Sequence, residues 1–250
     1  MAIAGAMAPK IFTSDLPLLR NEWIGIPLAI IIPILVAGAF GYFNGFLITK
    51  FDIQPIIATL VLFLGGRGIA KALSHGNLVE FNNPNFSYIG RGRPLGISVQ
   101  IILMFIIVIV AAWALRRTTF GRYVLAIGGN ERAAELAGVP VTRVKRQIYV
   151  LVALLSGLAG LIVVAINSSV DPYQVGDLME LDAIAAVAVG GTPFTGGKAS
   201  VIGTLIGAMF IHQIRYTLIS HGIPDGTTRM VIAAAIVIAV LMQRPKAGWR

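Results

Sequence analysis

The sequence predicts an all-α bundle of transmembrane helices with about six to seven crossings. Hydrophobic residues make up 56% of the 250 residues and charged residues only 12%, a balance that a water-soluble domain would not carry on its surface. Several apolar stretches approach the roughly 20 residues that a helix needs to span a bilayer. The basic residues are concentrated in a few connecting segments. We therefore expect one transmembrane domain over residues 1–250.

Seven candidate crossings follow from the apolar runs and the polar breaks between them. In chain order they are Ile24–Ile48, Gln54–Leu73, Ser98–Leu115, Ile148–Asn167, Leu181–Gly191, Val201–Ser220 and Met230–Met242. The segment 181–191 is too short to span alone, so we expect a short or broken helix there. Before the first crossing, Met1–Met7 is apolar but soon meets Pro9. It resembles the end of a helix, so we expect N-terminal helices to be missing from this chain.

The basic residues predict which side each connection faces. The connection between the third and fourth crossings carries seven Lys and Arg residues against Glu131 and Glu135, an excess that marks a cytoplasmic loop over residues 116–147. Alternation then places Lys50, Lys198 and the C-terminus on the cytoplasmic side as well. The formal charge of +9 thus lies on one face, and it gives no reason to expect a nucleic-acid partner.

No catalytic or metal centre is predicted. The chain has no cysteine and three scattered histidines, a pattern without metal-ligand spacing. No serine is placed beside a base, as nucleophilic catalysis would require. The apolar cores contain no carboxylate, which proton-coupled carriers usually need. An ion-coupled carrier or an intramembrane enzyme is therefore the weakest of the functional hypotheses.

The connection 116–147 contains a short helix with well-defined ends. Asn130 suits an N-cap, Glu131 suits a first turn, and Gly138 suits the left-handed residue after a C-terminus. A helix of about two turns is unstable alone in water, so something must pack against it. The spacing leaves two alternatives open: packing on the chain's own bundle, or docking on a partner. The residues of this element are Gly128, Gly129, Asn130, Glu131, Arg132, Ala133, Ala134, Glu135 and Gly138.

A second motif is rich in glycine. Gly190 and Gly191 follow the predicted short helix and permit backbone conformations closed to other residues. Gly203 and Gly207 lie four residues apart and form a small surface for close helix crossing. The glycines with predicted structural roles are Gly190, Gly191, Gly196, Gly197, Gly203 and Gly207. A phosphate-binding loop is disfavoured, because no strand precedes the run and no Gly-Lys-Ser/Thr sequence ends it.

Uncharged polar residues within the spans are candidates for a permeation path. They suit hydrogen bonds to hydroxyl groups better than ion conduction, although a hydrogen bond between helices is the more common role of such a residue. We expect Arg67, Lys71 and Arg215 to extend toward the outer membrane interface. The candidates for the path are Asn44, Gln54, Thr59, Asn167 and Gln213.

The two motifs resemble the permease subunits of ribose-type, carbohydrate-uptake ABC importers. The resemblance covers essentially the whole chain and is most specific over 120–138 and 180–192. The segments 53–60, 66–68 and 81–87 look most like the galactofuranose permease subgroup. Members of the family also carry earlier membrane segments with a Gly-Gly-Ile-Asp-Leu-Ser-Val-Gly motif, both of which are absent here.

The resemblance implies a permease of the bacterial inner membrane that translocates a monosaccharide, with galactofuranose as one candidate, by alternating access. It implies that Gly128–Gly138 docks on an ATP-binding subunit, which uses ATP and Mg, while this chain binds no cofactor and is not an enzyme. Other implied partners are a periplasmic sugar-binding protein, a second permease subunit, identical or different, and membrane lipid. A branched-chain amino acid or other small-solute permease of the same superfamily is the alternative.

Overall fold

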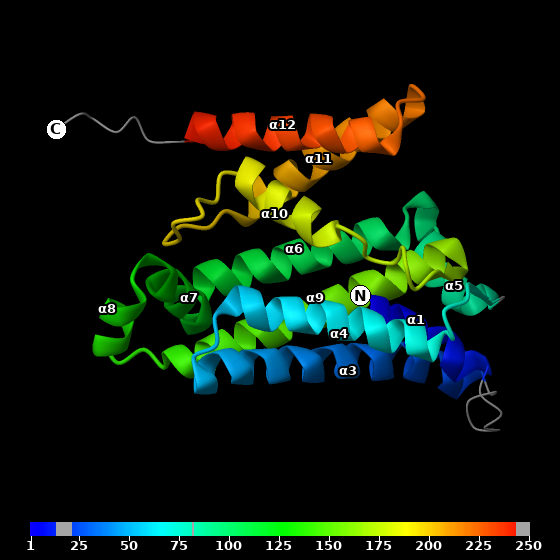
Figure 1. Ribbon diagram of the computed structural model, residues 1–250, viewed down its shortest axis with the longest axis horizontal. Coiled ribbons are helices and arrows are strands. Elements are labelled where there is room, and N and C mark those ends of the chain that lie inside the picture. The colour runs from blue at the N-terminus through cyan, green and yellow to red at the C-terminus, as the bar shows by residue number, and fades with distance from the viewer. Residues whose placement is uncertain (14–21, 82, 244–250) are drawn as a thin grey trace. The chain divides into compact units, whose positions relative to one another are not determined.

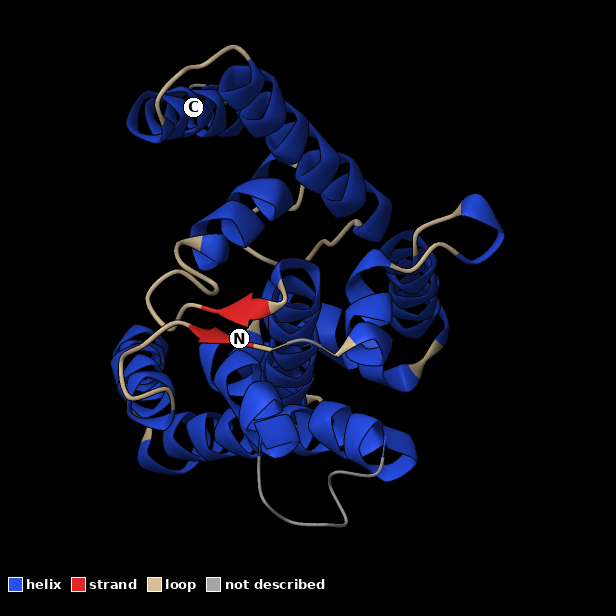
Figure 2. Ribbon diagram, turned by 90° about the vertical axis from the view of Figure 1, so that its right-hand side faces the viewer, coloured by secondary structure: helices blue, strands red, loops and turns tan. Residues whose placement is uncertain are grey.

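The computed structural model describes residues 1–13, 22–81 and 83–243 (Figure 1). The described chain is helical apart from two strands of two residues each (Figure 2), which confirms the predicted all-α class. It divides into two compact units. Unit 1 comprises Met1–Phe105 and Thr142–Asp177, and unit 2 comprises Ile106–Val141 and the chain from Leu178 onward. The predicted cytoplasmic C-terminus, residues 244–250, lies outside the described residues.

The elements of unit 1 come from two separate stretches of sequence. The first stretch contains α1 (Ala2–Thr13), α3 (Glu22–Phe51), α4 (Pro55–Leu73), β1 (Val79–Glu80), α5 (Pro84–Arg91) and the 3-10 helix η1 (Pro94–Gly96). The second contains nearly all of α9 (Val141–Asn167) and β2 (Ser169–Val170). The strands β1 and β2 pair antiparallel, with Val79 opposite Val170, a contact that the sequence analysis did not predict.

Unit 2 also combines two stretches of sequence. Helix α6 (Val99–Arg117) passes from unit 1 into unit 2 and buries none of its side chains. The remaining elements are α7 (Thr119–Gly129), α8 (Glu131–Leu136), α10 (Met179–Val189), α11 (Val201–Ser220) and α12 (Asp225–Gln243).

Five of the described helices are long and apolar enough to cross a bilayer. They are Ile24–Phe51, Pro55–Leu73, Val99–Arg117, Val141–Asn167 and Val201–Ser220. Three of them contain a predicted crossing, and Pro55–Leu73 and Val99–Arg117 each begin one residue after the predicted start. The predicted short segment forms α10, which has 11 residues. The last predicted crossing lies in α12, whose described apolar part is Gly226–Val237.

Helix α9 begins seven residues before the predicted crossing at Ile148, at Val141. Its first two turns contain Arg143, Lys145 and Arg146, which are good helix formers but cannot lie within lipid. The helix therefore extends beyond its apolar span. The range 116–147 is consequently not a loop throughout, because α7, α8 and the start of α9 occupy most of it.

Small residues bring the helices of unit 1 close together. Helix α1 continues through Pro9 to Thr13, and its alanines are buried against the core that contains Leu161 and Val164 of α9. A Cβ atom added to Gly160 of α9 would lie 2.5 Å from the Met1 carbonyl oxygen, so no side chain fits there. The chain in unit 1 thus packs as tightly as membrane helices with small residues at their interfaces do.

The predicted helix crossing of unit 2 is confirmed. A Cβ atom added to Gly207 of α11 would lie 2.9 Å from the Gly190 nitrogen, and one added to Gly190 would lie 2.5 Å from the Gly203 carbonyl carbon. Beside this crossing, a small apolar core joins α10, α11 and α12 through Ala185, Ile211 and Ile232.

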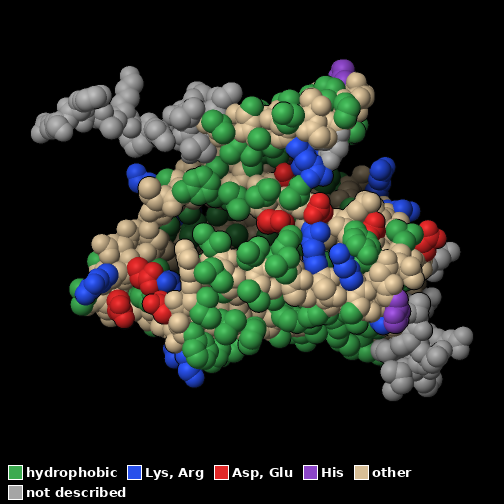
Figure 3. Space-filling view, in the orientation of Figure 1, with side chains coloured by type: hydrophobic (Ala, Val, Ile, Leu, Met, Phe, Trp, Pro, Cys, Tyr) green, Lys and Arg blue, Asp and Glu red, His purple; other side chains and the backbone are tan. Residues whose placement is uncertain are grey.

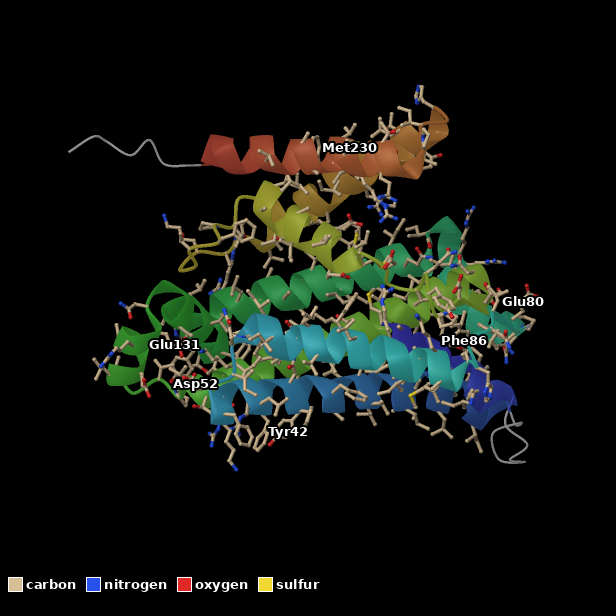
Figure 4. All side chains as sticks on the ribbon, in the orientation of Figure 1. Tyr42, Asp52, Glu80, Phe86, Glu131 and Met230 are labelled. Atoms are coloured by element: carbon tan, nitrogen blue, oxygen red, sulfur yellow. The ribbon has the colours of Figure 1, made fainter. Side chains whose placement is uncertain are left out.

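The charged residues of unit 1 separate toward its two ends, as the orientation argument requires. Helices α3 and α9 run antiparallel, so Arg146 lies beside Thr49, near the end where Asp52 follows α3 (Figure 4). Glu80 and Phe86 lie at the other end (Figure 4). Within unit 1, the residues predicted on the cytoplasmic side therefore share one end.

Three basic residues that the sequence predicts near the outer interface have protein partners. Arg67 Nη2 lies 2.7 Å from Asp177 Oδ1, and Lys71 Nζ lies 4.2 Å from the centroid of the Tyr173 ring. Arg215 Nη2 donates to Asp182 at 2.9 Å. The sequence did not predict these partners, because the two ion pairs join residues 110 and 33 positions apart and such pairs leave no local pattern in a sequence; the extension of the three residues toward the interface stays a prediction.

Candidate functional site

Helix α8 is held by backbone and capping bonds at both ends. The Asn130 side chain accepts a hydrogen bond from the Ala133 nitrogen at 2.9 Å, as predicted for an N-cap. At the other end Gly138 adopts a φ of +82°. The Gly138 nitrogen donates to the Glu135 oxygen at 2.9 Å, and the Val139 nitrogen donates to the Ala134 oxygen at 3.0 Å. This is a Schellman motif, so the predicted helix and both its ends are confirmed.

Almost nothing in the described chain covers α8. Ala134 is its one buried residue, while the Leu136 side chain is 85% exposed. Figure 4 labels Glu131 on the same helix. Ala134 therefore packs against the chain itself, while the coupling role predicted for the element stays a prediction. The exposed face consists of Arg132, Ala133, Glu135 and Leu136 together with Glu131.

Four glycines join the end of α7, which leads directly into α8, to the connection between α10 and α11 by direct backbone contact. We call Gly128, Gly129, Gly196 and Gly197 the glycine clasp. Gly196 and Gly197 have φ of +80° and +77°. A Cβ atom added to Gly128 would lie 3.2 Å from the Gly197 nitrogen, and one added to Gly197 would lie 3.3 Å from the Gly129 Cα. Side chains at Gly128, Gly196 or Gly197 would push these backbones apart, so the close contact requires glycine at these three positions, whereas a Cβ atom added to Gly129 would lie 3.7 Å from the Gly197 Cα, an ordinary contact.

The clasp is continuous with the crossing of α10 and α11. Residues 190–200 connect these two helices, and the Ser200 nitrogen donates to Thr192 Oγ1 at 3.2 Å across the base of the connection. Ser200 also caps α11, because its Oγ accepts from the Gly203 nitrogen at 3.1 Å. Backbone packing and side-chain hydrogen bonds thus connect the end of α7, directly before α8, with the connection between α10 and α11.

A polar layer lies one helical turn from the apolar core of unit 2. Asp182, Arg215 and Thr228 are three or four residues from Ala185, Ile211 and Ile232 respectively, which places them on the same helix faces. The ion pair of Asp182 and Arg215 is about one-third exposed, at 29% and 32%. Thr228 is fully buried, and its Oγ1 has no hydrogen-bond partner among the described residues.

Sequence reasoning missed this layer because it assigned Asp182 to the outer end of a helix and Arg215 to the membrane interface. The available signal was an acidic residue in the first turn of a short helix, opposite a basic residue in an apolar one. Only the crossing of the two helices brings the residues together.

The predicted permeation residues of unit 1 do not form one cluster. Asn44 is buried, and its Oδ1 has no partner in the described structure. Thr59 donates to the Pro55 oxygen of its own helix at 2.9 Å, and Gln213 donates to Thr217 at 3.4 Å. Gln54 and Asn167 lie at opposite ends of unit 1, so they cannot contact one small solute together.

The matching family model is described as the branched-chain amino acid transport system / permease component, and it matches residues 1–241. The chain belongs to this permease family. It is 36% identical to the ribose import permease protein of Escherichia coli K12 over 250 residues, which cover 98% of this chain and 75% of that protein. It is 42% identical to the ribose import permease protein of Bacillus subtilis over 207 residues, 82% of this chain and 64% of that protein.

The chain is also similar to a galactofuranose transporter permease protein of Escherichia coli K12, at 32% identity over 97% of this chain and 69% of that protein. These identities confirm the resemblance to carbohydrate permeases but do not single out the galactofuranose subgroup. No solved structure matches the chain. Family membership and the five apolar helices make the chain a multi-pass membrane protein, and proteins of this family are permease components of transporters, not enzymes.

Proposed function

We propose that the chain is the transmembrane subunit of an ATP-driven, binding-protein-dependent importer that carries a monosaccharide across the bacterial inner membrane. The relatives described above are named for ribose and galactofuranose, which share several hydroxyl groups on a small ring. No intramembrane carboxylate was found in the apolar cores of the sequence, which suits a neutral solute better than a proton-coupled one.

The exposed face of α8 carries the proposal for how transport is driven. This face docks on an ATP-binding subunit in the cytoplasm, with Leu136, 85% exposed in the chain alone, buried at the contact. Closure of the ATPase around ATP and Mg moves α8, and the glycine clasp passes the movement to the crossing of α10 and α11. The helices then rearrange between inward-open and outward-open states.

The remaining partners follow from this arrangement. A soluble sugar-binding protein delivers the solute to the periplasmic face, and a second permease subunit completes the path. Substrate choice is shared with the binding protein, so the chain needs only a polar path that accepts hydroxyl groups. Asn44, Gln54, Thr59, Asn167 and Gln213 stay candidates for that path, to be separated by individual substitution.

Uptake by the reconstituted transporter tests the proposal. The chain is placed in proteoliposomes with its ATP-binding subunit and binding protein, and ATP-dependent uptake of ribose, fructose and galactofuranose is measured beside that of leucine, isoleucine and valine. The expected result is uptake of one or more sugars and of none of the amino acids. Uptake of the amino acids instead would support the alternative that the description of the family model suggests. Uptake without the ATP-binding subunit would refute the ATP-driven mechanism.

A further inference from the structure

One side of α3 carries a stripe of apolar side chains that no described residue covers. Ile31, Leu35 and Phe43 are each more than half exposed, and Ala39 lies between them on the same helix face. Tyr42 is exposed beside them and points away from the helices of unit 1 (Figure 4). Figure 3 shows hydrophobic side chains along this side of α3. Since α3 is long enough to span the bilayer, the stripe faces apolar surroundings.

Two cations lie where this stripe ends. Lys50 Nζ is 5.1 Å from the centroid of the Phe46 ring, and the Arg146 guanidinium carbon is 5.4 Å from the same centroid. Phe51 meets Phe46 edge-on, with the centroids 5.9 Å apart. The ring thus holds both cations by cation–π contacts. We call Phe46, Lys50 and Arg146 the cationic cradle.

The cradle is held in place by hydrogen bonds within unit 1. Arg146 Nε donates to Thr49 Oγ1 at 2.7 Å, and Thr49 Oγ1 donates to the Gly45 oxygen at 2.8 Å. A Cβ atom added to Gly45 would lie 3.1 Å from the Arg146 Cα, so α3 and α9 meet closely at this level. The guanidinium is therefore oriented before any ligand arrives, which reduces the entropy lost on binding.

The cradle has an excess of positive charge. Among the described residues, neither Lys50 nor Arg146 forms a salt bridge, although Asp52 is nearby in the turn after α3 and is exposed. Two cations around one ring repel each other, and an anion between them would remove that repulsion. The bonds to Thr49 use only the Nε of Arg146, which leaves its two terminal nitrogens available to a phosphate.

We propose that the cationic cradle binds the phosphate group of an anionic phospholipid, such as phosphatidylglycerol, whose acyl chains lie along the exposed stripe of α3. A lipid fits better than a soluble phosphate because the cations sit at the end of a membrane-spanning helix, directly beyond the stripe and its exposed aromatic rings. Aromatic and basic residues in this order mark the level of the lipid headgroups, and basic pockets between helices at that level bind anionic lipids. The inference does not depend on which solute is transported.

Lipid retention by the purified transporter tests the proposal. The complex is equilibrated in detergent with equal amounts of phosphatidylglycerol and phosphatidylcholine, and the lipids that stay bound are counted by native mass spectrometry. The wild type should retain phosphatidylglycerol preferentially. Lys50→Gln should reduce that retention about fivefold, as expected for the loss of one basic residue near a membrane surface, and Arg146→Gln should reduce it by at least as much.

Lys71→Gln is the matched control, since Lys71 also lies over an aromatic ring, that of Tyr173, but belongs to the opposite end of unit 1. It should leave retention unchanged. Lys50 makes no described contact beyond the ring, so the Lys50 variant tests the site even if Arg146→Gln disturbs the packing of α9. Equal retention by wild type and Lys50→Gln would overturn the proposal. Displacement of the lipid by millimolar inorganic phosphate would also overturn it, because the cradle would then bind a soluble anion. Displacement by an added ATP-binding subunit would overturn it as well, because the cradle would then belong to a protein contact.

Discussion

Replacing Gly196 with alanine tests whether the glycine clasp transmits movement. Gly196 has a φ of +80°, a conformation that costs an L-residue about 1–2 kcal/mol. The added Cβ would also lie 2.8 Å from the Gly128 carbonyl carbon, so the two backbones must separate. The combined cost is about 2 kcal/mol or more, and at 1.36 kcal/mol per tenfold change this reduces the population with a closed clasp about 30-fold.

The assay compares ATP-driven uptake with ATP hydrolysis in the same proteoliposomes. Gly196→Ala should reduce uptake far more than hydrolysis, because α8 and its docking face are intact while its link to α10 and α11 is opened. Gly129→Ala is the control: its Cβ would lie 3.7 Å from the Gly197 Cα, an ordinary contact, and Gly129 has no positive φ. Normal coupling in the Gly196 variant would refute the role of the clasp, as would equal losses in both variants.

Two further experiments test the packing of unit 2, and both are measured by thermal unfolding in detergent. Gly207→Ala should lower the stability of the chain, because its Cβ would meet the Gly190 nitrogen at 2.9 Å, whereas Gly65→Ala in α4, with nothing within 4 Å, should not lower it; equal effects would contradict the close crossing. A double-mutant cycle of Asp182→Ala and Arg215→Ala should give a coupling energy of about 1 kcal/mol or less, since both side chains are about one-third exposed. Additive effects would show that the pair contributes nothing.

The membrane helices could be predicted because they depend on local composition. The bounds of α11 coincide with the predicted crossing Val201–Ser220, since Ser200 caps its start and polar residues follow its end. The ends of α8 could be predicted equally well, because capping uses residues within a few positions of each other. The start of α9 could not be predicted in this way, because basic residues that end an apolar span can still continue a helix in water.

The contacts that matter for function join residues far apart in the chain. In the clasp Gly128 contacts Gly197, and in the polar layer Asp182 pairs with Arg215. No local sequence pattern indicates that either pair of residues lies together. The cationic cradle could not be predicted either, because the sequence analysis counted Arg146 only as one of the basic residues of a predicted loop. The sequence correctly indicated that the glycines were structural, but it could not show which backbone each one approaches.

The affinity of the permease for its ATP-binding subunit tests the central claim most directly. Leu136→Ser removes the exposed leucine of α8. Leu78→Ser removes another exposed leucine, 54% accessible, two residues before Glu80, which lies at the opposite end of unit 1 from Asp52 (Figure 4). Burying a leucine side chain is worth about 2 kcal/mol, so the first variant should bind the subunit about 30-fold more weakly and the second should bind normally. Unchanged affinity in the Leu136 variant would contradict docking through α8.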